Sequence, residues 1–212
     1  MPVDMEYWRK WKEKMLSRLK RDIDVGYLDE DIKDILLKFF QNEHTFTISS
    51  CSGRITLIDG PQPWDRKNST IVFKKHEPIT PKEVKEMLTQ RVLHKLWLVV
   101  TGPIIHVCTD SIKEALKVLK LAREAGMKHS GILSMSKRGI IVELRTGVRL
   151  AILLKIKDEI VIDENKLHLI VRAANEALLE GKERLNRLRV KLGLRPHNYN
   201  CLLYTYPSPR DR

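Results

Sequence analysis

Hydrophobic residues recur at helical spacing in five stretches of the chain. In the first stretch, Trp8, Trp11, Met15 and Leu19 follow one another at intervals of three and four residues, which places them on one face of a helix. The third stretch opens with a threonine cap, a proline, and Glu83 three residues after the cap. The pattern predicts helices over residues 5–20, 29–40, 80–95, 110–125 and 163–192.

Short hydrophobic runs bounded by turn residues lie between these helices and predict strands. The expected strands cover residues 45–50, 54–58, 70–76, 96–101, 104–109, 132–136, 140–145, 151–154 and 159–162. Hairpins and helices are mixed, and strand and helix do not alternate regularly, which argues against a doubly wound parallel sheet. The pattern therefore favours an α+β fold with a mixed or antiparallel sheet and flanking helices.

Two segments share a strand, a polar turn and a second strand: residues 48–55, around Ser50-Cys51-Ser52-Gly53, and residues 133–140. Their similarity suggests the hypothesis of an internal duplication of a strand–turn–strand plus helix unit. We expect one α+β domain over residues 1–200. Residues 201–212 resemble the translation of a sequencing-library adapter, so we expect them to be non-native or disordered and to lie outside the fold.

Positive charge is concentrated near both ends of the domain. The 39 Lys and Arg residues outnumber the 27 Asp and Glu residues, which gives a net charge of +12. Most of the excess falls in residues 9–21 and 182–195, which include Lys12 and Arg187. Two basic helices are typical of a protein that binds a polyanion, although the same residues could serve only as solvated helix faces.

Other features of the sequence narrow the class of protein further. The longest hydrophobic run, residues 96–100, is too short to cross a membrane, and the first residues do not form a secretory signal. The three cysteines include no CxxC pair, so neither a disulfide framework nor a zinc site is indicated. We therefore expect a cytoplasmic protein with an anionic partner, without a membrane segment and without a metal. The sequence predicts no oligomeric state.

Polar residues suited to chemistry gather in a few places. The run Ser49-Ser50-Cys51-Ser52-Gly53-Arg54 forms a donor-rich turn whose backbone amides and Arg54 could hold a phosphate or carboxylate. His76 and His106, each on a predicted strand, suit proton transfer. The alternatives are an ordinary turn and two structural histidines. Neither the Rossmann glycine motif nor the P-loop motif is present.

Two further polar groups lie in the second half of the chain. Glu143 and Arg145 are two residues apart and share one face of a predicted strand, where they form either a surface ion pair or a positioned carboxylate. Residues 134–139 form a hairpin tip that carries Lys137 and Arg138. A hairpin tip often carries lysine for solubility alone, so this second group indicates little by itself.

Taken in order, several of these residues resemble the motifs of the tRNA wybutosine-synthesizing protein 3 family in its archaeal form. The resemblance covers about residues 5–192 and rests on residues 47–55, His76, Trp97, residues 103–107 and residues 143–146. It implies an S-adenosylmethionine-dependent methyltransferase that acts on the anticodon loop of tRNA(Phe). The implied reaction methylates the N4 nitrogen of a tricyclic guanosine derivative, which carries an aminocarboxypropyl side chain and lies next to the anticodon.

The resemblance also marks residues for the site. It marks His76, His106 and Glu143 as characteristic positions without assigning a chemical step to each. Our hypothesis is that one of these three catalytic candidates is the general base, and we prefer His106. The implied cofactor- or substrate-binding residues are Ser49, Ser50, Cys51, Ser52, Arg54, Trp97 and Arg145, and the expected tRNA-binding residues are Lys137, Arg138, Lys12 and Arg187. Trp64 is a second candidate for stacking on a base.

Two rival functions remain open from the residues alone. The first is a noncatalytic tRNA-binding module that uses only the basic helices. The second is a hydrolase in which Cys51 acts with His76 or His106. The methyltransferase hypothesis requires that the serine-cysteine turn and the two histidine strands meet in one pocket flanked by the basic helices.

Overall fold

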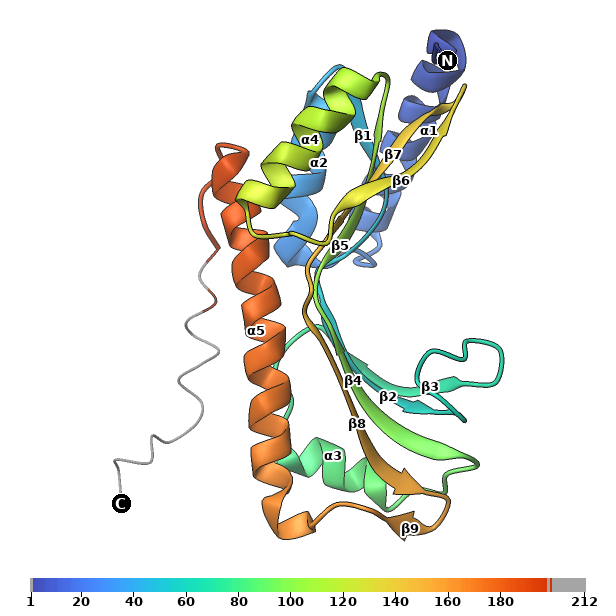
Figure 1. Cartoon of the computed structure of the whole chain (residues 1–212), viewed down its shortest axis with the longest axis vertical. Coiled ribbons are helices and arrows are strands. Elements are labelled where there is room, and N and C mark those ends of the chain that lie inside the picture. The colour runs from blue at the N-terminus through green and yellow to red at the C-terminus, as the bar shows by residue number, and fades with distance from the viewer. Residues whose placement is uncertain (1, 198, 200–212) are drawn as a thin grey trace.

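The computed structural model describes residues 2–197 and 199 (Figure 1). The expected non-native or disordered segment, residues 201–212, lies outside the described residues. The helices are α1 (Met5–Asp24), α2 (Lys33–Gln41), α3 (Pro81–Leu88), α4 (Ile112–Glu124) and α5 (Leu167–Lys191), with 3-10 turns η1 (Glu30–Ile32) and η2 (Glu164–Lys166). The strands are β1 (Thr45–Cys51), β2 (Arg54–Asp59), β3 (Thr70–Lys75), β4 (Lys95–Thr101), β5 (Ile104–Thr109), β6 (Gly131–Ser136), β7 (Gly139–Arg145), β8 (Arg149–Ile156) and β9 (Glu159–Ile160). No helix among the described residues is long and hydrophobic enough to cross a lipid bilayer.

The strands form two antiparallel sheets, which confirms the expected α+β class. The four-stranded sheet has the order β1-β5-β7-β6, and the five-stranded sheet has the order β3-β2-β4-β8-β9. Three times the chain leaves a strand of one sheet and enters a strand of the other within a few residues, at 52–53, 102–103 and 146–148. These three crossings lie side by side between the two sheets (Figure 1).

The strand, polar turn and second strand expected around Ser50-Cys51-Ser52-Gly53 are present but do not form a hairpin. β1 pairs with β5 and β2 pairs with β4, so the two strands never pair with each other. Gly53 has a φ of +97°, and a Cβ there would lie 3.2 Å from the Thr101 carbonyl oxygen, so the position favours glycine. Residues 133–140 do form a hairpin, between β6 and β7. The two segments compared as a duplication therefore differ in structure.

Each sheet has its own hydrophobic core, and α5 contributes to both. The core of the four-stranded sheet includes side chains of α1, α2, α4 and the C-terminal half of α5, such as Leu185 and Leu188. The core of the five-stranded sheet includes α3 and the N-terminal half of α5, such as Val171 and Leu178. Between these halves, a Cβ at Gly181 would lie 2.9 Å from Pro103 Cδ, so α5 packs closely on the crossings.

Some boundaries differ from those expected. α3 has the predicted capping box but ends at Leu88 rather than near residue 95. The following segment is fixed by Asp59, whose carboxylate accepts hydrogen bonds from the backbone amides of Leu93 and His94. His76 lies just after β3 rather than on a strand.

Candidate active site

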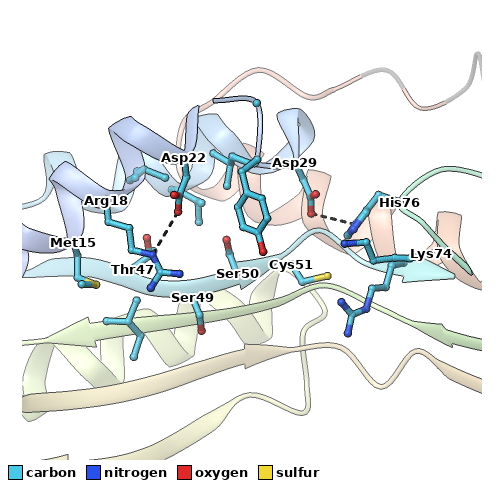
Figure 2. Close-up of a pocket in the computed structure, with 17 residues that line it drawn as sticks. Met15, Arg18, Asp22, Asp29, Thr47, Ser49, Ser50, Cys51, Lys74 and His76 are labelled. Carbon is cyan, nitrogen blue, oxygen red and sulfur yellow. Dashed lines mark ion pairs between the residues drawn. The ribbon is translucent and has the colours of Figure 1, made fainter. Parts of the chain in front are cut away.

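A pocket of about 460 Å³ lies where the two sheets meet, between α1, the loop that follows it, and β1, β2 and β3. Much of the predicted motif lines this pocket: Ser49, Ser50, Cys51, Arg54 and His76. Figure 2 shows Ser50 of β1 on the side of α1, Ser49 pointing the other way, and His76 and Lys74 at one end of the pocket. The structure therefore brings the serine-cysteine run and one of the two histidines together.

The carboxylate of Asp29 holds this end of the pocket in place. Its Oδ2 lies 3.2 Å from His76 Nδ1 and accepts the backbone N–H of Ser52 at 3.1 Å. His76 Nδ1 also lies 2.9 Å from the carbonyl oxygen of Gly53. Because a carbonyl oxygen can only accept, Nδ1 carries the hydrogen, and in the neutral ring Nε2 is then the basic nitrogen. Asp29 and His76 form an acid–imidazole pair fixed to the Ser52–Gly53 crossing.

The second histidine lies behind the pocket wall. His106 Nδ1 is 2.6 Å from Ser49 Oγ, and its Nε2 is 2.9 Å from Glu143 Oε2. Arg145 Nη1 lies 3.8 Å from Glu143 Oε1. Ser49 lines the pocket, whereas His106, Glu143 and Arg145 do not. His106 is therefore connected to the pocket through the hydroxyl of Ser49, and both of its ring nitrogens are engaged.

Two residues assigned to binding from the sequence face elsewhere. Ser52 is fully buried, and its Oγ accepts a hydrogen bond of 2.8 Å from Lys182 Nζ on α5. Lys182 also pairs with Asp31, so this contact ties α5 to the crossing. Trp97 lies on β4 outside the pocket, and its Nε1 donates to the Gly60 carbonyl oxygen at 3.3 Å.

The predicted tRNA-binding cations differ in whether they already form hydrogen bonds or ion pairs within the protein. Lys12 bonds to the carbonyl oxygen of Asn42, and its partial burial lowers its pKa below the usual value. Arg187 pairs with Glu183 at 3.4 Å. Much of the basic charge of α5 is likewise neutralised by ion pairs, namely Lys182–Asp31, Arg184–Glu180, Arg189–Asp34 and Lys191–Glu124. Many cations in the basic stretch of α5 thus form ion pairs within the protein.

The hairpin tip and Trp64 lie outside the pocket. Lys137 and Arg138 are exposed at the tip of β6–β7, and the Arg138 guanidinium lies 5.6 Å from the centre of the Tyr7 ring. The tip is joined to the start of α1 by a backbone hydrogen bond from Asp4 to Lys137. Trp64, in the loop between β2 and β3, is 66% exposed.

Sequence reasoning missed several residues that line the pocket: Arg18, Asp22, Tyr27, Asp29 and Lys74. Asp29 begins the helix expected over residues 29–40, a position at which an aspartate usually serves as the N-cap. It stands before η1, but its side chain makes no capping hydrogen bond and turns to Ser52 and His76 instead. Arg18 and Asp22 are one helical turn apart on α1 and form an ion pair at 3.5 Å, a spacing that the sequence does contain.

Cys51 lies beside this acid–imidazole pair. Ligand atoms of Asp29, Cys51 and His76 lie within 4.8 Å of one another, so the three side chains could hold a metal ion. His76 Nδ1, however, is committed to Gly53 and Asp29. Burial raises the pKa of the Cys51 thiol, although Arg54 and Lys182 oppose this effect. A thiol with a raised pKa is a poor nucleophile at neutral pH, which disfavours the hydrolase hypothesis.

Comparison with known proteins defines the class of protein and then the family. The chain is 44% identical over 195 residues to the tRNA(Phe) 7-((3-amino-3-carboxypropyl)-4-demethylwyosine(37)-N(4))-methyltransferase of Saccharolobus solfataricus, covering 92% of this chain and 93% of that protein. The corresponding methyltransferase 1 of Pyrococcus horikoshii is 36% identical over 187 residues, covering 88% of this chain and 95% of that protein. These relatives are enzymes that methylate tRNA.

Residues 10–193 match the family described as methyltransferase TYW3, and the chain belongs to this family. It is therefore a methyltransferase, as the motif resemblance implied. The fold agrees with solved structures: the PH1069 protein of Pyrococcus horikoshii superposes with a TM-score of 0.83 at 35% identity, covering 89% of this chain and 97% of that one. A hypothetical protein from Aeropyrum pernix has a TM-score of 0.69 at 29% identity, covering 78% and 98%.

Proposed function

We propose that this chain methylates the N4 nitrogen of 7-(3-amino-3-carboxypropyl)-4-demethylwyosine, next to the anticodon of tRNA(Phe), with S-adenosylmethionine as the methyl donor. The observation that carries the proposal is the gathering of Ser49, Cys51, Arg54, Asp29 and His76 around one pocket. Because its substrate is tRNA, we also place the enzyme in the cytoplasm.

The side chains around the pocket suit both reactants. The donor carries a carboxylate as well as positively charged ammonium and sulfonium groups, and the pocket offers charges of both signs. Asp22 and Asp29 are its acidic side chains, whereas Arg18, Arg54 and Lys74 are its cations. Arg54 and Lys74 are suited to the carboxylate of the substrate side chain or of the donor, because charged donors make the stronger hydrogen bonds to carboxylates.

S-adenosylmethionine, when bound, supplies an electrophilic methyl group. Methylation of N4 would cleave the bond from the donor's sulfur to the methyl carbon, and it would require the proton on N4 to leave. His76 Nε2 is the pocket-wall base that can accept it, since its Nδ1 is occupied. Asp29, 3.2 Å from Nδ1, stabilises the imidazolium that results. The rest of the pocket holds the two reactants in line, and alignment alone can supply much of the rate.

His106 has a supporting role in this mechanism. Its two nitrogens contact Glu143 and Ser49, so it fixes the position of the Ser49 hydroxyl in the pocket wall. This assignment reverses the preference that the sequence suggested, because His76 and not His106 lines the pocket.

Transfer of labelled methyl groups to tRNA(Phe) that carries the demethylated base tests this proposal. His76→Ala should lower the rate by about 10²- to 10⁴-fold, the usual contribution of a general base. His44→Ala is a matched control, because the exposed His44 pairs with Asp110 outside the pocket. A His76→Ala enzyme with the wild-type rate and pH profile would exclude His76 as the base. Calorimetry that finds no binding of S-adenosylmethionine, with or without tRNA, would contradict the proposed donor.

A further inference from the structure

One face of the five-stranded sheet is left uncovered. Along β2, β4 and β8, alternate side chains belong to the core with α3 and α5, which lie on the same side of these strands (Figure 1). The intervening side chains point to the opposite face. Among the described residues, no helix contributes to a core on that face. The side chains of its central strands are Arg54, Thr56 and Ile58 from β2, Trp97, Val99 and Thr101 from β4, and Arg149, Ala151 and Leu153 from β8, of which Thr56 and Val99 are buried among their neighbours. We call these nine residues, together with Ile71 and Lys74 of β3, the open face.

The charge on the open face has a single sign. Among the eleven residues, the charged side chains are Arg54, Lys74 and Arg149, and none is Asp or Glu. Lys95 adds a further cation on the same face of β4, where its Nζ lies 6.0 Å from the centre of the Trp97 ring. The register places Arg54 opposite Thr101 and Thr101 opposite Arg149, so the two arginines flank one threonine across three strands. Lys74 lies opposite Thr56. None of the three cations forms an ion pair with another residue in the part of the chain that the structure describes, unlike many of the cations of α5.

The open face continues directly from the pocket. Arg54 and Lys74 line both, whereas Arg149 lies outside the pocket. Since neighbouring strands are about 4.8 Å apart, Arg149 stands about 10 Å beyond Arg54. Farther along the strands, an apolar row follows in which Ile71 is opposite Ile58, Ile58 opposite Trp97, and Trp97 opposite Leu153. A cationic row therefore lies next to the pocket, and an apolar row with one tryptophan lies beside it.

We propose that the open face binds the RNA strand that flanks the methylated base. The phosphates lie against Arg54, Lys74 and Arg149, and unstacked bases rest on the apolar row that contains Trp97. Single-stranded loops are bound in this way, by cations along the backbone and aromatic faces under the bases. If a second copy of this chain covered the open face with its own open face, the same cations would face one another. The charge therefore favours RNA as the occupant of this face. The inference rests on the proposed function, because it takes the pocket to hold the target base.

Arg149 gives the cleanest test of the phosphate contacts, because it lies outside the pocket. The affinity of wild-type, Arg149→Gln and Arg123→Gln proteins for full-length tRNA(Phe) is measured over a range of salt concentrations. Arg123 is an exposed control on α4. Arg149→Gln should weaken binding about tenfold, the usual effect of losing a hydrogen bond to a charged group. It should also lower the slope of log K against log salt by about 1, since one phosphate contact is lost. Equal affinity and equal slope for the two variants would overturn the proposal.

Ala151 provides a second test that does not depend on removing a contact. Ala151 is exposed on β8, two residues from Arg149. Ala151→Glu and Ala151→Lys add side chains of similar size, so a loss of folding would affect both alike. The proposal predicts weaker tRNA binding for the glutamate variant and equal or tighter binding for the lysine variant.

The outcomes separate this surface from the proposed reaction. If Ala151→Glu leaves tRNA binding unchanged but dissociates an oligomer in sedimentation, the open face is a protein interface and the proposal is wrong. If wild-type protein binds tRNA with the expected dependence on Arg149 but transfers no methyl group, the surface stands and the proposed reaction fails. Affinity for S-adenosylmethionine alone should be the same in the Arg149→Gln and Arg123→Gln variants.

Discussion

Replacement of Lys182 by methionine should destabilise the protein more than the loss of an exposed ion pair would. The Lys182 side chain is only 3% exposed, donates to Ser52 Oγ at 2.8 Å and pairs with Asp31. Methionine fills a similar volume without the charge, so the carboxylate of Asp31 and the hydroxyl of Ser52 both lose the ammonium group as a donor. These two groups join η1 and the Ser52–Gly53 crossing to α5, and the crossing positions Cys51 and Arg54 in the pocket.

The size of the effect follows from burial. Removing one partner of a buried ion pair costs about 3–5 kcal/mol. Asp31 is 17% exposed and keeps a hydrogen bond of 3.3 Å from the Tyr199 hydroxyl, so we expect the lower end of this range. A loss of about 3 kcal/mol corresponds to a fall in Tm of about 6–12 °C for a protein of this length.

Urea unfolding and calorimetry of Lys182→Met and Lys191→Met test this reasoning. Lys191 is on the same helix and pairs with Glu124, but its side chain is 46% exposed, so its replacement should cost less than about 1 kcal/mol. Adding Asp31→Asn to Lys182→Met should recover part of the lost stability, because no unpaired carboxylate then remains. Equal losses for Lys182→Met and Lys191→Met would refute the structural role of the buried lysine.

Three further predictions concern other parts of the molecule. Burial raises the pKa of the Cys51 thiol, so peptide mapping should show that Cys51 is alkylated slowly at pH 7 and faster above pH 9. Burial raises the pKa of Cys108 to about 12, so Cys108 should react more slowly still. Rapid alkylation of Cys51 at pH 7 would contradict this prediction. The hydrogen bond to Asp110 raises the pKa of His44. The small contribution of this pair to stability is therefore complete at low pH and is lost as the pH rises through the pKa of His44. An NMR titration of the Asp110→Asn variant should show the pKa of His44 falling toward 6.5. Gly181→Val should destabilise by about 1–3 kcal/mol in thermal unfolding, since its side chain would overlap Pro103; an unchanged Tm would show that α5 can move away.

The sequence predicts local structure well where one residue pattern decides it. The tryptophans and leucines of α1 and the capping box of α3 lie where their spacing indicates. The partner of a strand is decided by distant residues. Ser50-Cys51-Ser52-Gly53 has the composition of a hairpin turn, yet the chain passes from one sheet to the other there. Nothing local distinguishes these outcomes, because both need small residues and a glycine.

The candidate site shows the same limit. The run from Ser49 to Arg54 and His76 were singled out from their chemistry and do line one pocket. Asp29 was missed because an aspartate before a helical segment is usually a cap, and only the folded chain brings it to His76. The basic stretch of α5 was expected to face tRNA, whereas Lys182 instead binds Ser52, 130 residues away along the chain. Contacts over such separations have no periodicity in the sequence.

The most direct test of the central claim is mass spectrometry of nucleosides from tRNA(Phe) incubated with S-adenosylmethionine and either wild-type protein or Asp29→Asn. Wild-type protein should add one methyl group to the demethylated tricyclic nucleoside. Asp29→Asn, which weakens the partner of His76, should add it far more slowly. Methylation of another nucleoside, or full activity in the Asp29→Asn variant, would contradict the proposed chemistry of this pocket.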